Sequence, residues 1–279
     1  MWSRLVDAYK WRRILSRSAL DPRRLEKPVD PPGNRDFILA GCPRTGTSLL
    51  TAALYRPPSI VTVMEPWDGL RLPPAELFAS LRTEIVGTGR LTRGRLDLDA
   101  LGDGRVEWQR DGERSFGVEA DDGFLLGVKW PTFWQYLDLL PDTRFLVTIR
   151  HPVEVISSFQ RVGGRLAMGL DYEVPFNAPM NRGLARATDD QAVRRALLYQ
   201  YVNSRLLPHL GRERVFVVRY ERWFQDPDRL RDEISEFLGE PIQSFNVTIR
   251  PEGARQHDPE IVDLVRDHVP VARELGYDV

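Results

Sequence analysis

One stretch constrains this chain more than any other: a strand, a short loop and the start of a helix over residues 37–50. An apolar run ends at Gly41, a loop with Pro43 and Gly46 follows, and an apolar segment compatible with a helix begins at Leu49. Such a loop presents backbone N–H groups at a helix N-terminus, where the helix dipole favours an anion. The stretch therefore predicts a site for a phosphate-bearing ligand.

The side chains of this loop are of the kind that bind phosphate or sulfate. Arg44 adds a planar cationic fork, and Thr45, Thr47 and Ser48 add hydroxyl donors around Gly46. The loop departs from the G-x-x-x-x-G-K-[ST] motif of NTPases, because Thr47 stands where the lysine should be. From this loop alone, an ordinary strand-to-helix turn stays open as the alternative.

A second anion motif begins at Arg150, directly after a buried apolar strand. Arg150-His151-Pro152 opens a helix that also carries Ser158 and, one turn further on, Arg161. A helix start brings Arg150, free N–H groups and the Ser158 hydroxyl toward one anion, and Arg161 could reach the same anion. We interpret His151 as structural, because Pro152 and the helix start define the turn.

Together these segments resemble a known family. The loop resembles the 5′-phosphosulfate loop, G-x-P-R-[ST]-G-T-[ST], of sulfotransferases that use 3′-phosphoadenosine 5′-phosphosulfate, and Arg150–Ser158 resembles their 3′-phosphate motif, with His151 in place of Asp or Asn. Tyr220-Glu221 and the following residues resemble the family's Y-E-x-x-x-x-x-P…F-L-G segment, which implies that Tyr220 lies near the adenine. The resemblance implies that the nucleotide is bound by Arg44, Thr45, Gly46, Thr47, Ser48, Arg150, Ser158, Arg161 and Tyr220.

Two further residues resemble the catalytic groups of the branch that contains bacterial and tyrosylprotein sulfotransferases. Glu65 matches its glutamate base and Lys129 the assisting lysine of a K-x-P motif, whereas the cytosolic branch has a histidine after that lysine and this chain has none there. The implied reaction is in-line transfer of a sulfonyl group to an acceptor hydroxyl. Glu65 would take the hydroxyl proton, and Lys129 and Arg44 would stabilise charge on the leaving oxygen.

Strands alternate with helices along the chain, and several strands are continuous apolar runs. This pattern predicts an α/β fold with a central parallel sheet flanked by helices, and the resemblance implies that it is a three-layer P-loop type. We expect a single domain over 1–279, with a basic N-terminal helix and linker at 1–35. An acceptor-side insertion is expected over 68–123, with a hairpin around Asp111-Gly112. The segment 163–188 is predicted to be an ordered loop, and 258–277 a single helix.

Composition limits the partners. The net charge of −1 gives no field that would attract nucleic acid. The single cysteine, Cys42, excludes an intrachain disulfide and a multi-cysteine zinc site, and no stretch reaches the ~18 apolar residues of a membrane-spanning helix. We therefore expect a cytoplasmic protein without a metal. Basic and aromatic residues over 1–30 form either a helix packed on the domain, which we favour, or a peripheral contact with anionic membrane.

Two alternatives to a sulfotransferase remain at this point. A P-loop kinase or NTPase is disfavoured by Thr47 and by the lack of a clear magnesium-holding Asp after a strand. A non-catalytic nucleotide-binding protein is disfavoured by the presence of Arg44, Glu65 and Lys129 together. The acceptor, whether sugar, lipid or small molecule, and the oligomeric state are left open by the sequence.

Overall fold

The computed structural model describes residues 30–94, 116–121, 123–172, 177–247 and 257–278. Within them, five parallel strands form a central sheet in the order β2-β5-β1-β6-β7. The strands are β1 (Asp36–Gly41), β2 (Ile60–Met64), β5 (Leu125–Lys129), β6 (Arg144–Ile149) and β7 (Val215–Arg219). The apolar strands and the parallel pairing confirm the predicted sheet, since a sheet covered on both faces needs apolar residues on both sides.

Side chains of successive residues in β1 enter two different cores, which makes the fold three-layered. Phe37 and Leu39 pack with the helices on one face of the sheet, and Ile38 and Ala40 pack with those on the other. The first face is covered by α2 (Thr47–Ala53), α9 (Arg222–Gln225) and α10 (Pro227–Leu238). The second is covered by α3 (Pro74–Thr88), the 3₁₀ helix η2 (Phe133–Asp138), α5 (Pro152–Val162) and α8 (Gln191–Leu206).

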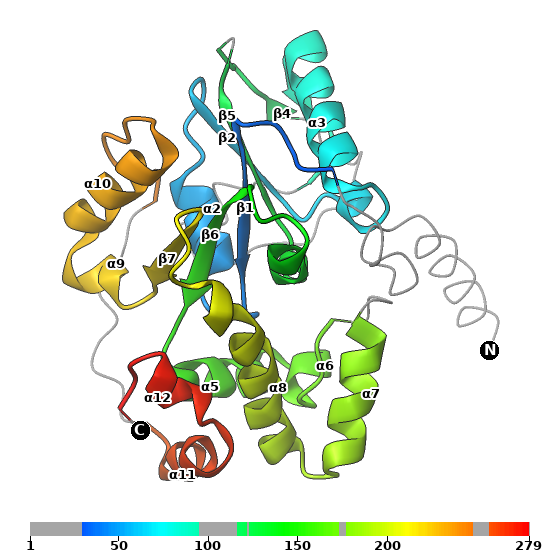
Figure 1. The fold of residues 1–279 in the computed structure, drawn as a ribbon, viewed down its shortest axis with the longest axis vertical. Helices are drawn as coiled ribbons and strands as arrows, with labels where there is room; N and C mark the ends of the chain where they lie inside the picture. Colours follow the sequence, from blue (N-terminus) through cyan, green and yellow to red (C-terminus); the bar gives the residue numbers. More distant parts are fainter. Residues whose placement is uncertain (1–29, 95–115, 122, 173–176, 248–256, 279) are drawn as a thin grey trace, which may run out of the picture.

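The remaining helices gather at one end of the sheet, around α5 and α8 (Figure 1). They are α6 (Gly164–Ala167), α7 (Ala178–Ala187), α11 (Pro259–His268) and α12 (Val271–Glu274), whereas the short 3₁₀ helix η4 (Leu207–His209) continues from α8 and leads into β7. Because the carboxyl ends of β1 and β6 also point to this end, the loops after these strands lie between the sheet and the helices. In open parallel sheets, ligands bind outside these strand ends.

The 68–123 segment adds elements beside the sheet. The 3₁₀ helix η1 (Trp67–Leu70) leads into it, and it contains helix α3 and two short antiparallel strands, β3 (Arg90–Leu91) and β4 (Phe116–Gly117). Helix α3 is part of the main core, because its Leu77, Phe78 and Leu81 are fully buried. The predicted hairpin at Asp111-Gly112 lies outside the described residues.

The expectations for 163–188 and 258–277 were wrong. The first segment contains α6 and α7, because Met180 and Leu184 stand one helical turn apart and bury against the core beside α8. The second is divided into α11 and α12, because Pro270 caps the start of α12 and cannot continue α11. The basic segment 1–29 lies outside the described residues, so its predicted packing and membrane contact stay predictions. No helix among the described residues is both long and apolar enough to cross a bilayer.

Candidate active site

The loop between β1 and α2 folds tightly against β6 because two of its residues are glycine. At Gly41, where φ is 149°, an added Cβ would lie 2.4 Å from Oγ1 of Thr148. At Gly46, where φ is 99°, a Cβ would lie 2.6 Å from the ring of Tyr220. Only glycine fits both the backbone conformation and the space at these positions.

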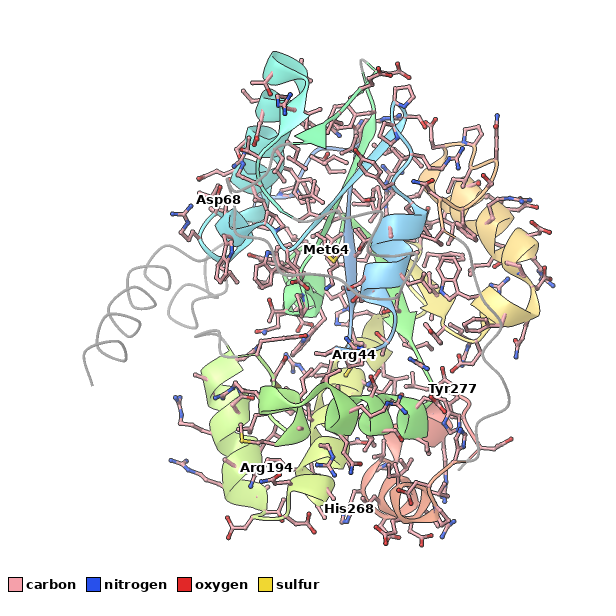
Figure 2. All side chains as sticks on the ribbon, turned by 180° about the vertical axis from the view of Figure 1, so that it is seen from behind. Arg44, Met64, Asp68, Arg194, His268 and Tyr277 are labelled. Carbon is pink, nitrogen blue, oxygen red and sulfur yellow. The ribbon has the colours of Figure 1, made fainter. Side chains whose placement is uncertain are left out.

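Arg44 sits at the turn of this loop in a left-handed backbone conformation, with φ of 72°. A non-glycine residue pays roughly 1–3 kcal/mol for such a conformation, and it persists where the surrounding structure imposes it. The side chain donates a hydrogen bond from Nε to Oγ of Ser158 on α5, at 3.0 Å. Arg44 lies between the sheet and the helices at its end (Figure 2). The loop and helix α5 are therefore in direct contact.

The three hydroxyl residues of the loop have different roles. Thr45 is fully buried, and its Oγ1 donates to the Cys42 carbonyl at 2.7 Å and lies 2.6 Å from Oγ1 of Thr148. The expectation that Thr45 adds a hydroxyl donor for a ligand is therefore corrected: its hydroxyl is used inside the protein to hold the loop. Thr47 begins α2 and Ser48 is half-buried beside Lys129.

Glu65 and Lys129 form a buried ion pair at the ends of two neighbouring strands. The last pair of β2 and β5 is Met64 with Lys129, so Glu65 comes one residue beyond it. The Glu65 N–H donates to the Lys129 carbonyl at 2.7 Å, while Lys129 Nζ donates to Oε1 of Glu65. Their side chains are 6% and 4% exposed, so the two charges face each other with little water between them. Lys129 Nζ also lies 3.5 Å from Oγ of Ser48, which links the pair to the loop.

Glu65 is the second non-glycine residue with a left-handed backbone, with φ of 52°. The two such residues among the described ones, Arg44 and Glu65, are both predicted site residues. This coincidence points to function, because backbone strain of this kind gathers at active sites.

The guanidinium of Arg150 is held from two directions. Its Cζ stands 3.9 Å from the ring centroid of Tyr220, and its Nη2 lies 3.2 Å from Oε2 of Glu154, one turn along α5. The Tyr199 hydroxyl donates to the Arg150 carbonyl at 2.9 Å. Ser158 is buried on the same helix, two turns from Arg150. The structure thus brings Arg44, Arg150, Ser158 and Tyr220 together.

The start of α5 is fixed by the C-terminal part of the chain. The His151 N–H donates to Oε1 of Glu221 at 2.7 Å, and the Tyr277 hydroxyl donates to Oε2 of the same carboxylate at 3.2 Å. The His151 ring stacks on His257 and packs edge-on against Tyr277. Burial, together with the neighbouring His257, lowers the pKa of His151. These contacts agree with a structural role for His151.

Arg161, a predicted site residue, and Trp67 lie at the margins of this cluster. Arg161 is in the last turn of α5 and is exposed. On the other margin, two residues after Glu65, Trp67 is 37% exposed and packs edge-on against Trp130, whose Nε1 donates to the Pro66 carbonyl at 2.6 Å.

Sequence reasoning did not assign roles to Glu221, Tyr199, Tyr277 or Glu154. Glu221 had a usable signal, because it directly follows Tyr220 at the end of a predicted strand. Glu154 had another, because it stands four residues after Arg150 on one helix face. Tyr199 and Tyr277 had none, because they are far away in the sequence and come together with α5 only in the folded chain.

A sequence profile of the sulfotransferase family matches residues 36–244, which is more than half of the chain. The chain belongs to the sulfotransferase family. The match spans the loop at Arg44, the Glu65–Lys129 pair, the Arg150 motif and Tyr220, whereas His257 and Tyr277 lie outside it.

Several known proteins are similar to this sulfotransferase-family chain. Nodulation protein NoeE of Sinorhizobium fredii (strain NBRC 101917 / NGR234) is 27% identical over 217 residues, which is 72% of this chain and 49% of that protein. The chain thus spans about half the length of this relative.

Two solved structures are also similar. The sulfotransferase domain of the Synechococcus PCC 7002 olefin synthase has a TM-score of 0.45 and 19% identity, covering 91% of this chain and 98% of that one. The sulfotransferase from Alicyclobacillus acidocaldarius has a TM-score of 0.45 and 19% identity, covering 90% and 98%.

Membership of the sulfotransferase family favours the first of the three functions considered from the sequence. The kinase alternative loses its support, since the resemblance to an NTPase loop is explained by a sulfotransferase loop with Arg44 and Thr47. Among the residues that the structure describes, no group of three or more His, Cys, Asp and Glu side chains is placed to hold a metal ion.

Proposed function

We propose that this protein transfers a sulfonyl group from 3′-phosphoadenosine 5′-phosphosulfate to the hydroxyl of a sugar, lipid or other small-molecule acceptor. One observation carries the proposal: the buried Glu65–Lys129 pair stands beside the phosphate loop, with Lys129 Nζ 3.5 Å from the loop's Ser48. The arrangement sets a carboxylate and a cation next to a loop suited to an anion.

The donors on both sides of the cluster fit a nucleotide with phosphates at the 5′ and 3′ positions. Arg44, Thr47, Ser48 and the backbone at Gly46 would hold the 5′-phosphosulfate. Arg150 and Ser158 would hold the 3′-phosphate, with a planar guanidinium already fixed over Tyr220. Arg161, exposed on the last turn of α5, could join this group by a change of rotamer. When bound, the nucleotide supplies an activated sulfonyl group on a good leaving phosphate.

Glu65 is the proposed base. The hydroxyl of the acceptor must lose its proton as its oxygen attacks, and a positioned carboxylate can take it. Lys129 keeps Glu65 oriented through the ion pair and the backbone hydrogen bond between the two residues. Because Lys129 Nζ reaches both Glu65 and the loop, it can also donate toward the oxygen on which charge develops, as can Arg44.

Calorimetry on the full chain tests the proposal through its nucleotide preference. We expect 3′-phosphoadenosine 5′-phosphate to bind well above ATP and above adenosine 5′-phosphosulfate, which lacks the 3′-phosphate. Equal affinity for nucleotides with and without the 3′-phosphate would contradict the roles of Arg150 and Ser158.

A screen of acceptor extracts with a radiolabelled sulfonyl donor then tests turnover. Transfer of label to an acceptor hydroxyl is the expected result. Tight binding of the nucleotide without transfer to any acceptor would favour a non-catalytic nucleotide-binding protein instead.

A further inference from the structure

The two candidate anion sites touch each other through a tyrosine ring. The backbone of Tyr220 is fixed at the end of β7, where its N–H donates to the carbonyl of Ile149, the residue before Arg150. From this point the ring reaches the loop at Gly46, and the Arg150 guanidinium stands 3.9 Å from its centroid. One half-buried aromatic ring therefore contacts both the 5′-side loop and the arginine of the 3′-side motif.

The fit on the loop side is close. A Cβ at Gly46 would lie 2.6 Å from Cδ2 and 3.0 Å from Cε2 of Tyr220, so the ring is packed against the main chain with no room for a side chain. Phe224 supports the ring edge-on from one turn further along the chain, with centroids 5.4 Å apart. The ring cannot approach the loop more closely, and its size sets how near Arg150 can come.

We propose that Tyr220 is a positioning residue that fixes the distance between the 5′-side loop and Arg150, and thereby makes the site specific for nucleotides phosphorylated at both the 3′ and 5′ positions. This inference rests on the proposed function. It differs from the role implied by the resemblance, in which the tyrosine lies near the adenine. A nucleotide with a phosphate at the 5′ position alone would not use this distance, whereas a 3′,5′-bisphosphate would.

The contact with Arg150 also explains why Tyr220, which acts as a spacer between the loop and Arg150, is aromatic. A guanidinium over a ring is attracted by the ring's electrons, which holds the planar fork in one orientation without using its N–H donors. Those donors remain directed to Glu154 and to an incoming phosphate. An aliphatic side chain at position 220 would give neither the thickness nor the attraction.

The test compares Tyr220→Leu and Tyr220→Phe with the unchanged protein in calorimetry, using 3′-phosphoadenosine 5′-phosphate and adenosine 5′-monophosphate. For Tyr220→Leu we expect the bisphosphate to bind about 3–30-fold more weakly, the range of a cation–π contact. The monophosphate should bind within about 2-fold of the unchanged protein, because it does not use Arg150. Tyr220→Phe keeps the ring and should keep the ratio of the two affinities.

The possible results separate this inference from the proposed function. If the unchanged protein does not prefer the bisphosphate, the proposed function fails and the spacer role fails with it. If that preference exists but Tyr220→Leu leaves it intact, or weakens both nucleotides equally, the spacer role alone is overturned. Equal losses in Tyr220→Phe and Tyr220→Leu would also overturn it, by assigning the effect to the hydroxyl group.

A second variant probes the same contact from the loop. With Tyr220 in place, Gly46→Ala should weaken bisphosphate binding. In the Tyr220→Leu background it should weaken binding less, because leucine leaves room for the new methyl group. Gly239→Ala is the matched control, since Gly239 has φ of 68° at the end of α10 and nothing within 4 Å of the added Cβ. Losses that simply add in the double variant would overturn the spacer role. Circular dichroism identifies any variant that fails to fold. If Gly46→Ala does not fold, the comparison of Tyr220→Leu with Tyr220→Phe tests the spacer role alone.

Discussion

Main-chain geometry holds Glu65, the proposed base, in place. Arg150, the arginine proposed to bind the 3′-phosphate, is instead held by side chains from distant segments. In the strand-end half of the site (Gly41–Ser48, Glu65 and Lys129), position follows from strand pairing and from left-handed backbone at Arg44 and Glu65. In the helix half (Arg150–Ser158), it follows from hydrogen bonds and ring contacts with residues such as Tyr199, Glu221 and Tyr277.

The difference predicts how each half responds to mutation. A strand end stays in place when one side chain is changed, so a substitution there should remove a chemical group and leave its neighbours where they are. The helix half is supported by several modest contacts, each worth about 0.5–1.5 kcal/mol when the groups are neutral. Losing one of them should shift the arginine slightly and change affinity more than turnover.

The largest expected effect is in the strand-end half, at the buried pair. Glu65→Gln removes the proposed base and should lower turnover by about 10²–10⁴-fold. It also leaves Lys129 buried without its counter-charge, which should lower the free energy of unfolding by about 3–5 kcal/mol. Turnover, once an acceptor is known, and urea unfolding measure the two effects separately.

The matched control is the double variant Glu65→Gln, Lys129→Met. Because it removes both charges, it should recover most of the stability that Glu65→Gln loses, while turnover stays low. If the double variant regains turnover as well, the loss in the single variant came from stability and Glu65 is not the base. If Glu65→Gln turns over within a few-fold of the unchanged protein, the base lies elsewhere.

The same contrast explains which parts of the molecule could be predicted from the sequence. Glu65 directly follows one apolar strand and Lys129 ends another, so a parallel sheet had to bring them to one edge. The contact between Arg44 and Ser158 was not foreseen, because a hydrogen bond between a loop and a helix depends on the angle at which the helix packs.

The burial of individual side chains also could not be predicted from the sequence. From the sequence, the Thr45 hydroxyl is expected to donate to a phosphate like the other hydroxyls of the loop. In the structure, the turn at Gly41 places the Thr45 side chain beneath the loop, against Thr148. Helix α7 was missed because the Gly, Pro and Asn residues around it favour loops, while the burial of Met180 and Leu184 outweighs that preference. Local signals identify which groups are present, and packing decides which of them face the site.

A second prediction extends the comparison to a carboxylate packed among the helices. Asp171, between α6 and α7, is fully buried, and burial raises its pKa from 3.8 to about 7. Its Oδ1 accepts the Tyr172 N–H, but its Oδ2 has no hydrogen-bond partner within the described part of the chain. Since the folded pKa is above the unfolded one, the folded state binds the proton more tightly, and stability falls as pH rises from about 4 to about 7.

Asp171→Asn should remove that part of the pH dependence. Relative to the unchanged protein, we expect a similar free energy of unfolding at pH 4 and a gain of roughly 2–4 kcal/mol at pH 8, where Asp171 would otherwise be a buried anion. Urea unfolding at both pH values measures the difference. The exposed Asp189→Asn variant is the control and should show the same pH dependence as the unchanged protein. An equal change at both pH values would mean that Asp171 is not the group that titrates.

The smallest expected effect is in the helix half, at its most remote contact. Tyr277→Phe removes the hydroxyl that donates to Glu221 at 3.2 Å but keeps the ring that packs against His151. The free energy of unfolding should fall by about 1.5–3 kcal/mol, the net value of a hydrogen bond to a charged group, and bisphosphate affinity should fall by no more than about 3-fold. Tyr136→Phe is the control, since Tyr136 is also buried and its hydroxyl has no partner among the described residues, so removing it should cost no stability. If the two variants behaved alike, the Glu221–Tyr277 contact would contribute nothing to holding α5. A larger affinity loss in Tyr277→Phe than in Tyr220→Leu would show that the C-terminal contacts, rather than the ring beneath Arg150, set the geometry of the 3′ side.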